Sequence, residues 1–344
     1  MFQRIARMLA VVLVLAGAMG CSWVMDDFTE CPEGLRVQLK VDAGISSVGS
    51  LGAVHFAEEV SEASLFVFSS DGSYVGHYSE QVDALKQNDF IMDLPLEPGR
   101  YKIVAWTGLA DDKYITSELT PGKSTVDDLT VVLETDEENR QNEYLSPLWH
   151  GVTEDIEIKK MTRPLCEVNM KKCSNNFVVV LHDFNGNSIK GDTFTYEIRT
   201  ANGSMAHDSS LLEDDEISYG AYFVETAEVS KYDDTKAAAM DLTVARAELN
   251  TLRLVKDNDT RLVIRESATG SLVLDINLIQ YILMTREYYE DRVGVKLTDQ
   301  QYLDYEDKYS IMFTMMPTGT IINPYALVEL RINGWVLRAQ SGNL

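Results

Sequence analysis

The fold class is decided by an alternating octapeptide near the start of the chain, Leu35-Arg36-Val37-Gln38-Leu39-Lys40-Val41-Asp42. Apolar and polar residues take turns along it. This is the pattern of a β-strand with one face in a core and the other in solvent. Short runs of the same style return along the rest of the chain, with turn residues between them. The sequence therefore predicts an all-β protein.

Turn residues separate paired apolar runs in the first half of the chain. Residues 65–68 and 74–78 flank an Asp71-Gly72 turn, which predicts a hairpin. A further strand is predicted at residues 129–133. The first half is therefore expected to consist of short strands joined by tight turns.

A Pro-Gly turn precedes the apolar run that ends at Trp106. Pro98 pre-sets one turn residue, and Gly99 is expected to supply the positive φ of the next, so that the chain reverses into a strand from Tyr101. Residues 134–143 are acidic and polar, and we expect a loop there near the end of a first domain.

The second half repeats this style with longer connections. Four compact apolar or alternating runs are bounded by Gly, Asn and Asp, and each predicts a strand: residues 177–181, 194–198, 262–264 and 272–276. Near the C-terminus, Asn333-Gly334 separates the apolar runs 326–332 and 335–338. This dipeptide is typical of a two-residue hairpin turn.

Helices are expected to be few and short. Thr298 and Gln301 have the spacing of a capping box, which predicts a helix that begins after Thr298. The length of 344 residues is enough for two β-sandwich units. We expect an N-terminal domain at residues 35–150 and a C-terminal domain at residues 151–344.

The chain begins with the pattern of a secretory signal peptide. Arg4 and Arg7 form a positive n-region, residues 8–19 are uncharged and apolar, and small residues end at Gly20. A transmembrane helix needs about 20 apolar residues, which is more than this run provides. Residues 1–20 are therefore expected to be removed during export.

A cysteine, Cys21, follows the small residues directly, as in the lipobox of bacterial lipoproteins. Ala18 stands where that motif normally has leucine. We expect acylation of Cys21, with residues 21–34 as a lipidated tether. An acyl chain contributes about 0.8 kcal/mol per buried CH₂, so two or more chains hold a protein on a membrane essentially permanently.

The chain is strongly acidic. Its formal charge is −24, and the loss of Arg4 and Arg7 with the signal peptide makes it −26. Such a surface repels nucleic acid, and it offers no basic patch to anionic lipid. Nucleic acid is therefore not expected as a partner, and the charge is explained by the solubility of an exported protein.

Four cysteines occur in the chain: Cys21, Cys31, Cys166 and Cys173. With Cys21 acylated, the other three allow one disulfide in an oxidising compartment, and their spacing does not select a pair. There is no Cys-x-x-Cys and no Cys/His spacing suited to zinc, so no metal site is expected.

No motif for catalysis stands out. None of the five histidines lies in a metalloprotease or nucleophile-elbow motif, and His182-Asp183 lacks a suitable serine. Clusters are expected by chance among 54 acidic residues, so they identify no glycosidase pair. The segment Asp257-Asn258-Asp259 is expected to be a turn, since it lacks the glycine and distal glutamate of an EF-hand. Trp335 is expected in the core. We expect no catalytic residue, cofactor or small-molecule substrate.

Five motifs occur in an order that resembles one known family. They are, along the chain, Cys31-Pro32-Glu33-Gly34-Leu35, Pro98-Gly99-x-Tyr101, Leu148-Trp149-His150-Gly151, Lys172-Cys173-Ser174-Asn175-Asn176-Phe177 and Ile332-Asn333-Gly334-Trp335. Together with Cys21, this order is similar to that of the fimbrillin-associated anchor proteins, the lipoprotein minor subunits of Bacteroidota-type fimbriae. The resemblance covers nearly the whole mature chain, although Cys166 matches no feature of the family.

The resemblance implies a non-enzymatic protein with two tandem transthyretin-like β-sandwich domains and few short helices. Such a protein sits in the outer membrane through its lipid, holds a fimbrium to the cell surface and limits its length. Its partners would be fimbrillin subunits, joined by β-strand addition. Two alternatives stay open. A surface glycan-binding lipoprotein of a polysaccharide-uptake system would need exposed aromatics on one face, and an extracellular hydrolase would need two carboxylates in a cleft.

Overall fold

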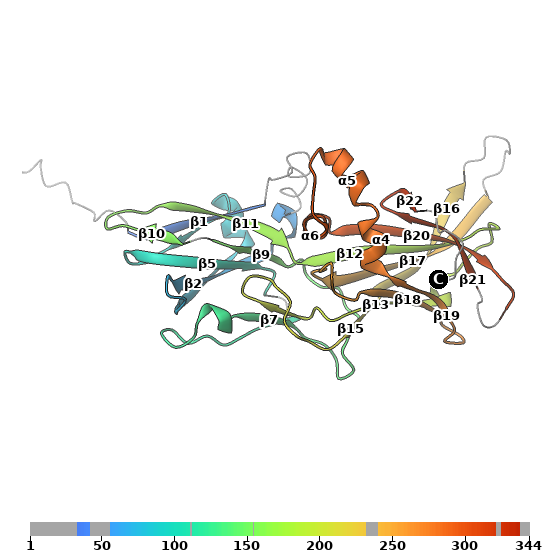
Figure 1. The fold of residues 1–344 in the computed structure, drawn as a ribbon, viewed down its shortest axis with the longest axis horizontal. Helices are drawn as coiled ribbons and strands as arrows, with labels where there is room; N and C mark the ends of the chain where they lie inside the picture. The colour runs from blue at the N-terminus through green and yellow to red at the C-terminus, as the bar shows by residue number, and fades with distance from the viewer. Residues whose placement is uncertain are drawn as a thin grey trace, which may run out of the picture.

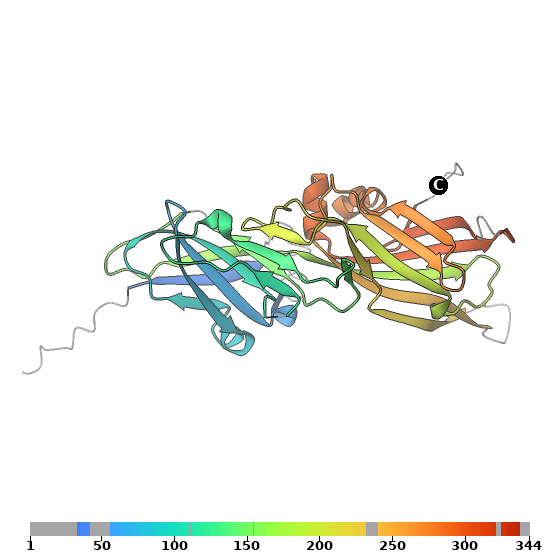
Figure 2. The ribbon, with the colours of Figure 1, turned by 90° about the horizontal axis from the view of Figure 1, so that it is seen from below.

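A computed structural model of the chain describes residues 33–41, 56–110, 112–153, 155–231, 240–320 and 325–337. This part of the chain is built mainly from strands, as predicted. The molecule is elongated (Figure 1). The first strand begins at one end of the long axis, and the C-terminal half of the chain occupies the other end (Figure 2).

The N-terminal half is an eight-stranded sheet in the order β3-β2-β5-β9-β11-β1-β4, with β10 beside β5. Its strands are β1 (Leu35–Val41), β2 (Glu62–Ser69), β3 (Tyr74–Gln81), β4 (Ile91–Leu94), β5 (Gly99–Thr107), β9 (Trp149–Val152), β10 (Ile156–Ile158) and β11 (Leu165–Lys172). Side chains of β1 and β4 share one core with those of β2 and β5. The sheet therefore folds over on itself as a sandwich.

The alternating octapeptide forms β1, a central strand that pairs in parallel with β11 and antiparallel with β4. Leu35, Val37 and Leu39 point into the core, as their spacing predicts. Gln38 is buried too, because its amide group donates to the main-chain oxygen and to the carboxylate of Asp89. The strand prediction is confirmed, whereas the expectation of one fully solvated face is wrong.

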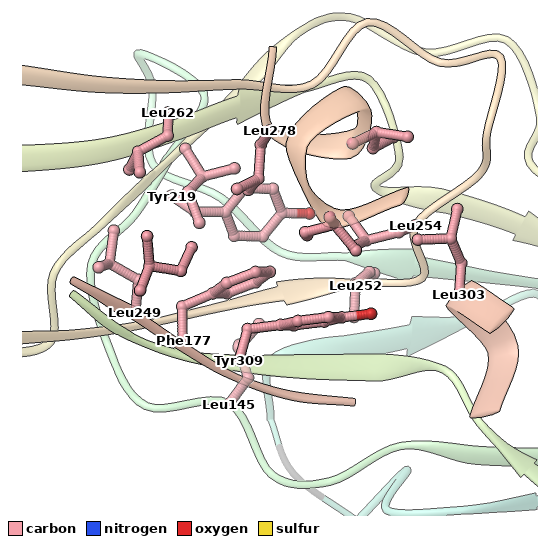
Figure 3. Packing of buried hydrophobic residues seen from close by; sticks show 14 of the residues in the cluster. Leu145, Phe177, Tyr219, Leu249, Leu252, Leu254, Leu262, Leu278, Leu303 and Tyr309 are labelled. Atoms are coloured by element: carbon pink, nitrogen blue, oxygen red, sulfur yellow. The ribbon is translucent and has the colours of Figure 1, made fainter. Parts of the chain in front are cut away.

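The C-terminal half is a sandwich of two sheets with helices along one side. The six-stranded sheet, in spatial order, contains β16 (Phe223–Lys231), β17 (Met240–Leu252), β12 (Ser174–Asp183), β20 (Lys308–Pro317), β21 (Tyr325–Ile332) and β22 (Trp335–Leu337). The five-stranded sheet contains β19 (Leu272–Asn277), β18 (Arg261–Glu266), β13 (Phe194–Thr200), β15 (Ile217–Gly220) and β8 (Arg140–Gln141). In the core between them, the rings of Phe177 and Tyr309 stack with centroids 5.2 Å apart (Figure 3).

The two halves are interlocked. A three-stranded sheet joins β6 (Tyr114–Thr116) and β7 (Thr130–Leu133) to β14 (Ser204–Ala206), and β8 pairs with β15. One hydrophobic core runs from Trp106 in the first half to Phe177 in the second. Leu145 lies beside the aromatic stack of the second half (Figure 3). Both halves therefore share a packed interface rather than a loose linker.

A single extended segment runs through both halves, because β11 continues through Cys173 directly into β12 (Figure 1). The pairing of β11 with β1 and β9 assigns residues 151–172 to the N-terminal sheet. A division of the chain into domains 35–150 and 151–344 does not follow this pairing, since it cuts through β9. The chain passes between the sheets at Cys173.

Most turn predictions are confirmed. The hairpin at Asp71-Gly72 joins β2 and β3, and that at Asn333-Gly334 joins β21 and β22. The prediction for Gly99 is wrong, since this residue does not have a positive φ and already lies in β5. The segment 134–143 is not entirely a loop, because β8 forms within it against β15.

The helices that lie wholly within the described ranges are short. They are α3 (Val82–Gln87), α4 (Leu278–Leu283), α5 (Arg286–Val293), α6 (Asp299–Tyr305) and the 3₁₀ turns η1 (Val126–Asp128) and η2 (Gly191–Thr193). The predicted capping box of Thr298 and Gln301 opens α6. No helix in the described ranges is long and apolar enough to cross a membrane.

Candidate functional site

The end of the molecule at which β1 begins is closely held. The main-chain N–H of Met161 donates to the carboxylate of Glu33 at 2.6 Å. Gly34 has φ +138°, and a Cβ there would lie 2.5 Å from the main-chain oxygen of Leu94. A glycine is therefore required in the Cys-Pro-Glu-Gly-Leu motif so that the chain can turn past β4 into β1. Cys21 and Cys31 lie outside the described residues.

The far half of the molecule offers a sheet edge with exposed apolar side chains. β22 ends the six-stranded sheet, and β21 is its one strand partner in the part of the chain that the structure describes. Trp335 and Val336 are 38% and 41% exposed, so the expectation that Trp335 packs in the core is wrong. An edge strand presents unpaired main-chain N–H and C=O groups, which can pair with a strand of another protein.

Trp335 stacks on Tyr288 of α5, which is 40% exposed. The ring centroids are 4.4 Å apart and the rings are nearly parallel, at 8°. Each ring covers one face of the other. The pair is therefore a stack of two rings, and not a flat platform of two side-by-side rings. Exposed Trp and Tyr are the residues most enriched at the centres of protein interfaces.

The other edge strand of this sheet, β16, contacts η2. Gly191 of η2 packs against it, so that a Cβ at this position would lie 2.3 Å from the main-chain oxygen of Glu225. The Gly191 N–H donates to the hydroxyl of Thr226 at 2.9 Å. These contacts hold η2 against β16.

Two adjoining cavities lie on either side of Arg140 and Asn142. The larger, about 430 Å³, is lined by both of these residues and by Thr195, Glu197 and Arg265 among others. The smaller is about 280 Å³ and contains carboxylates that are paired with cations, such as Glu143 with Lys113 at 2.5 Å. In the larger cavity the hydroxyl of Ser218 donates to the carboxylate of Glu197 at 2.7 Å, and Arg199 pairs with the same carboxylate.

Burial shifts the pKa values of three further groups. Burial raises the pKa of the Cys166 thiol to about 11 and that of Cys173 to about 12, which disfavours the thiolate. Both are free thiols, at opposite ends of β11, so they do not bridge each other. Burial lowers the pKa of His150 to about 4, and its ring bonds to the main-chain oxygen of His207 at 2.8 Å. A disulfide to Cys31 stays a prediction.

The segments with possible site chemistry serve as turns. The side chain of Asn258 donates to the hydroxyl of Thr200 and the main-chain oxygen of Ala201, so the Asp257-Asn258-Asp259 segment is a turn, as expected. The carboxylate of Asp183 accepts from the main-chain N–H of Asn185 at 2.7 Å. Within the described ranges, no group of three or more His, Cys, Asp or Glu side chains could hold a metal ion.

Residues 28–341 match the model of one protein family, described as fimbrillin-A associated anchor proteins Mfa1 and Mfa2. The chain belongs to this family. It is 22% identical over 338 residues to the minor fimbrium anchoring subunit Mfa2 of Porphyromonas gingivalis, covering 96% of this chain and 93% of that protein. The family resemblance inferred from the order of the five motifs is thereby confirmed.

Solved structures share the fold of this anchor-family chain. A Bacteroides thetaiotaomicron protein whose name proposes polysaccharide binding is 30% identical, with a TM-score of 0.74, over 90% of this chain and 98% of its own. A second protein of that organism, named as a candidate adhesin, is 28% identical, with a TM-score of 0.76, over 91% and 99%. The P. gingivalis anchor Mfa2 has the same fold, with 20% identity and a TM-score of 0.65 over 90% of this chain and all of that one.

Two structural features of this anchor-family chain were not predicted from its motifs. The first is the Trp335–Tyr288 contact, which joins residues far apart in the chain. The one hint of it in the sequence was that the glycan-binding alternative requires exposed aromatic side chains. The second is Lys172, which is buried between Asp307, at 2.5 Å, and Glu59, at 3.0 Å. Its position in the Lys-Cys-Ser-Asn-Asn-Phe motif gave no sign of these distant partners.

Proposed function

We propose that this protein is an outer-membrane lipoprotein, acylated at Cys21, that holds a fimbrium at the cell surface and limits its length. It binds fimbrial subunits by β-strand addition and has no enzymatic activity. The observation that carries the proposal is the family match over residues 28–341, which follows a lipoprotein signal pattern that ends at Cys21. A fimbrial anchor needs a membrane attachment as well as a fimbrial partner, so the signal pattern and the family match support the same role.

The shape of the molecule supports this arrangement. The first strand, coloured blue, begins at one end of the long axis (Figure 2), and β22 lies in the C-terminal half of the molecule (Figure 1). A tether of residues 21–34 spans at most about 50 Å when fully extended, so the N-terminal sheet stays near the membrane. The second half then points away from the membrane, where a fimbrial subunit can reach it.

A pull-down from cross-linked cell envelopes tests the proposal. The tagged protein is recovered beside a Cys21→Ala control, and its partners are identified by mass spectrometry. We expect fimbrial subunits with the wild type, and fimbriae shed into the medium by the control. Recovery of transporter components or glycan-processing enzymes in place of fimbrial subunits would instead support the glycan-binding alternative.

We further propose β22 as the edge that accepts a fimbrial strand. Val336→Lys places a charge on this edge, and we expect recovery of fimbrial subunits to fall about tenfold, the equivalent of 1.4 kcal/mol. Val75→Lys on the edge strand β3 is the matched control, because Val75 is 38% exposed against 41% for Val336. Equal recovery with both variants would show that β22 is not the docking edge.

A further inference from the structure

We infer that β1 and the continuous strand formed by β11 and β12 carry pulling force through the molecule, from the tether to the far half. The inference rests on the proposed function, because a lipid-tethered anchor is pulled at the start of β1 while the fimbrium pulls on the second half. The force would pass from β1 to β11 through their strand pairing, and from β11 along the chain into β12.

The path begins with a parallel pair. Six residue pairs join β1 to β11, from Arg36 opposite Leu165 to Val41 opposite Met170. Because the two strands are parallel, the tethered end of β1 and the end of β11 that continues into β12 lie at opposite ends of this ladder. Force from the membrane pulls β1 one way, and force from the second half pulls β11 the other way.

This geometry loads the ladder in shear. When two paired strands slide along each other, all hydrogen bonds between them must yield together, whereas strands peeled apart from one end lose their bonds one pair at a time. β1 and β4 illustrate the second case, since they are antiparallel and Leu35 lies opposite Leu94 at the tethered end. β1 therefore resists detachment more strongly when it is pulled along β11 than when it is peeled from β4.

Contacts around the ladder resist the same sliding. The side chains of Leu35, Val37 and Leu39 are buried in the core, so that withdrawal of β1 would expose them to water. Lys40 of β1 forms an ion pair with Glu167 of β11. The main-chain N–H of Arg36 adds a hydrogen bond to the main-chain oxygen of Pro164, one residue before β11 begins.

The far end of the path is held more firmly than its start. β12 is a central strand, and it pairs over eight residues with β17 and over eight residues with β20. Between the halves, the buried ammonium group of Lys172 links β11 to Asp307, next to the first residue of β20. β1 has ten residue pairs, six with β11 and four with β4, against sixteen for β12, so β1 is the first element to give way.

Single-molecule pulling of the purified mature chain tests this path. One handle replaces the lipid at residue 21, and the other is attached at Asn185, in the exposed turn after β12. A control places the second handle at Glu97, in the exposed loop after β4, so that β1 and β4 are peeled apart. We expect the force that detaches β1 to be about twofold or more higher with Asn185, since the parallel bonds yield together. Equal forces at the same loading rate would overturn the inference.

A disulfide gives a second test on one molecule. Val37 lies opposite the native Cys166, and neighbouring strands are about 4.8 Å apart, within the Cα separation that a disulfide spans. In Val37→Cys pulled at residues 21 and 185, oxidation should abolish the detachment of β1, and reduction should restore it. If oxidised and reduced forms detach at the same force and extension, the path does not run through this ladder. Neither experiment uses a fimbrial subunit, so a failed pull-down and a failed pulling test are distinct results.

Discussion

Replacement of Cys21 by alanine should abolish acylation of the protein and its retention in the outer membrane. Two or more acyl chains, at about 0.8 kcal/mol for each buried CH₂, supply the whole of the proposed membrane attachment. Their loss leaves a strongly acidic protein with a formal charge of −26 and no basic patch for lipid. We expect incorporation of an alkyne-labelled fatty acid to fall to background, together with the amount of protein in the outer-membrane fraction.

The next cysteine along the chain provides the control for this experiment. Cys31→Ala removes a thiol only ten residues away and should keep full fatty-acid labelling. Labelling that persists in Cys21→Ala, or is lost in Cys31→Ala, would place the lipid elsewhere. Because neither residue lies in β1, both variants should retain the urea-unfolding midpoint of the wild-type protein when all are measured under reducing conditions.

Replacement of Lys172 by methionine should destabilise the fold by about 3 kcal/mol, at the lower end of the range for breaking a buried ion pair. Burial disfavours the charge of Lys172, but the carboxylates of Asp307 and Glu59 outweigh it and raise the pKa of the ammonium group. The variant leaves Asp307 without this cation, while Lys308 still pairs with Glu59 at 3.1 Å. The measurement is the free energy of unfolding from urea titration at pH 7.

The sign of the pKa shift supports measurement at neutral pH. A raised pKa in the folded state means that the stabilisation is complete below the ordinary pKa of lysine and is lost only as pH rises through the folded-state value. Lys40→Met is the control, because the Lys40–Glu167 pair is exposed and should contribute only about 0–1 kcal/mol. If both variants unfold at the same urea concentration, the buried ion pairs of Lys172 do not stabilise the fold.

A double replacement separates the contribution of the two charges from that of side-chain packing. Lys172→Met combined with Asp307→Leu removes both charges, and we expect it to recover at least half of the lost stability, since no uncompensated charge remains buried. A double variant that is as unstable as the sum of the two single variants would show that the charges of Lys172 and Asp307 are not coupled.

Sequence alone determined the features that depend on neighbouring residues. Asn333 and Gly334 have φ values of 51° and 83°, as a two-residue hairpin turn with two positive φ angles requires. Thr298 and Gln301 form their capping box because the bonded groups lie three residues apart in the chain. The proposed processing at Cys21 would also depend on local sequence, because a signal peptidase reads such a pattern before any fold exists.

Only the tertiary structure decided features that depend on partners far along the chain. Arg140 and Gln141 form a strand because β15 offers a partner, since the acidic segment around them has no strand pattern. Trp335 is exposed because β22 is an edge strand, and alternation looks the same in edge and central strands. The ion pair between Lys40 and Glu167 joins residues 127 positions apart. Contacts at such a separation leave no local signature, so only the folded chain shows that β1 lies beside β11.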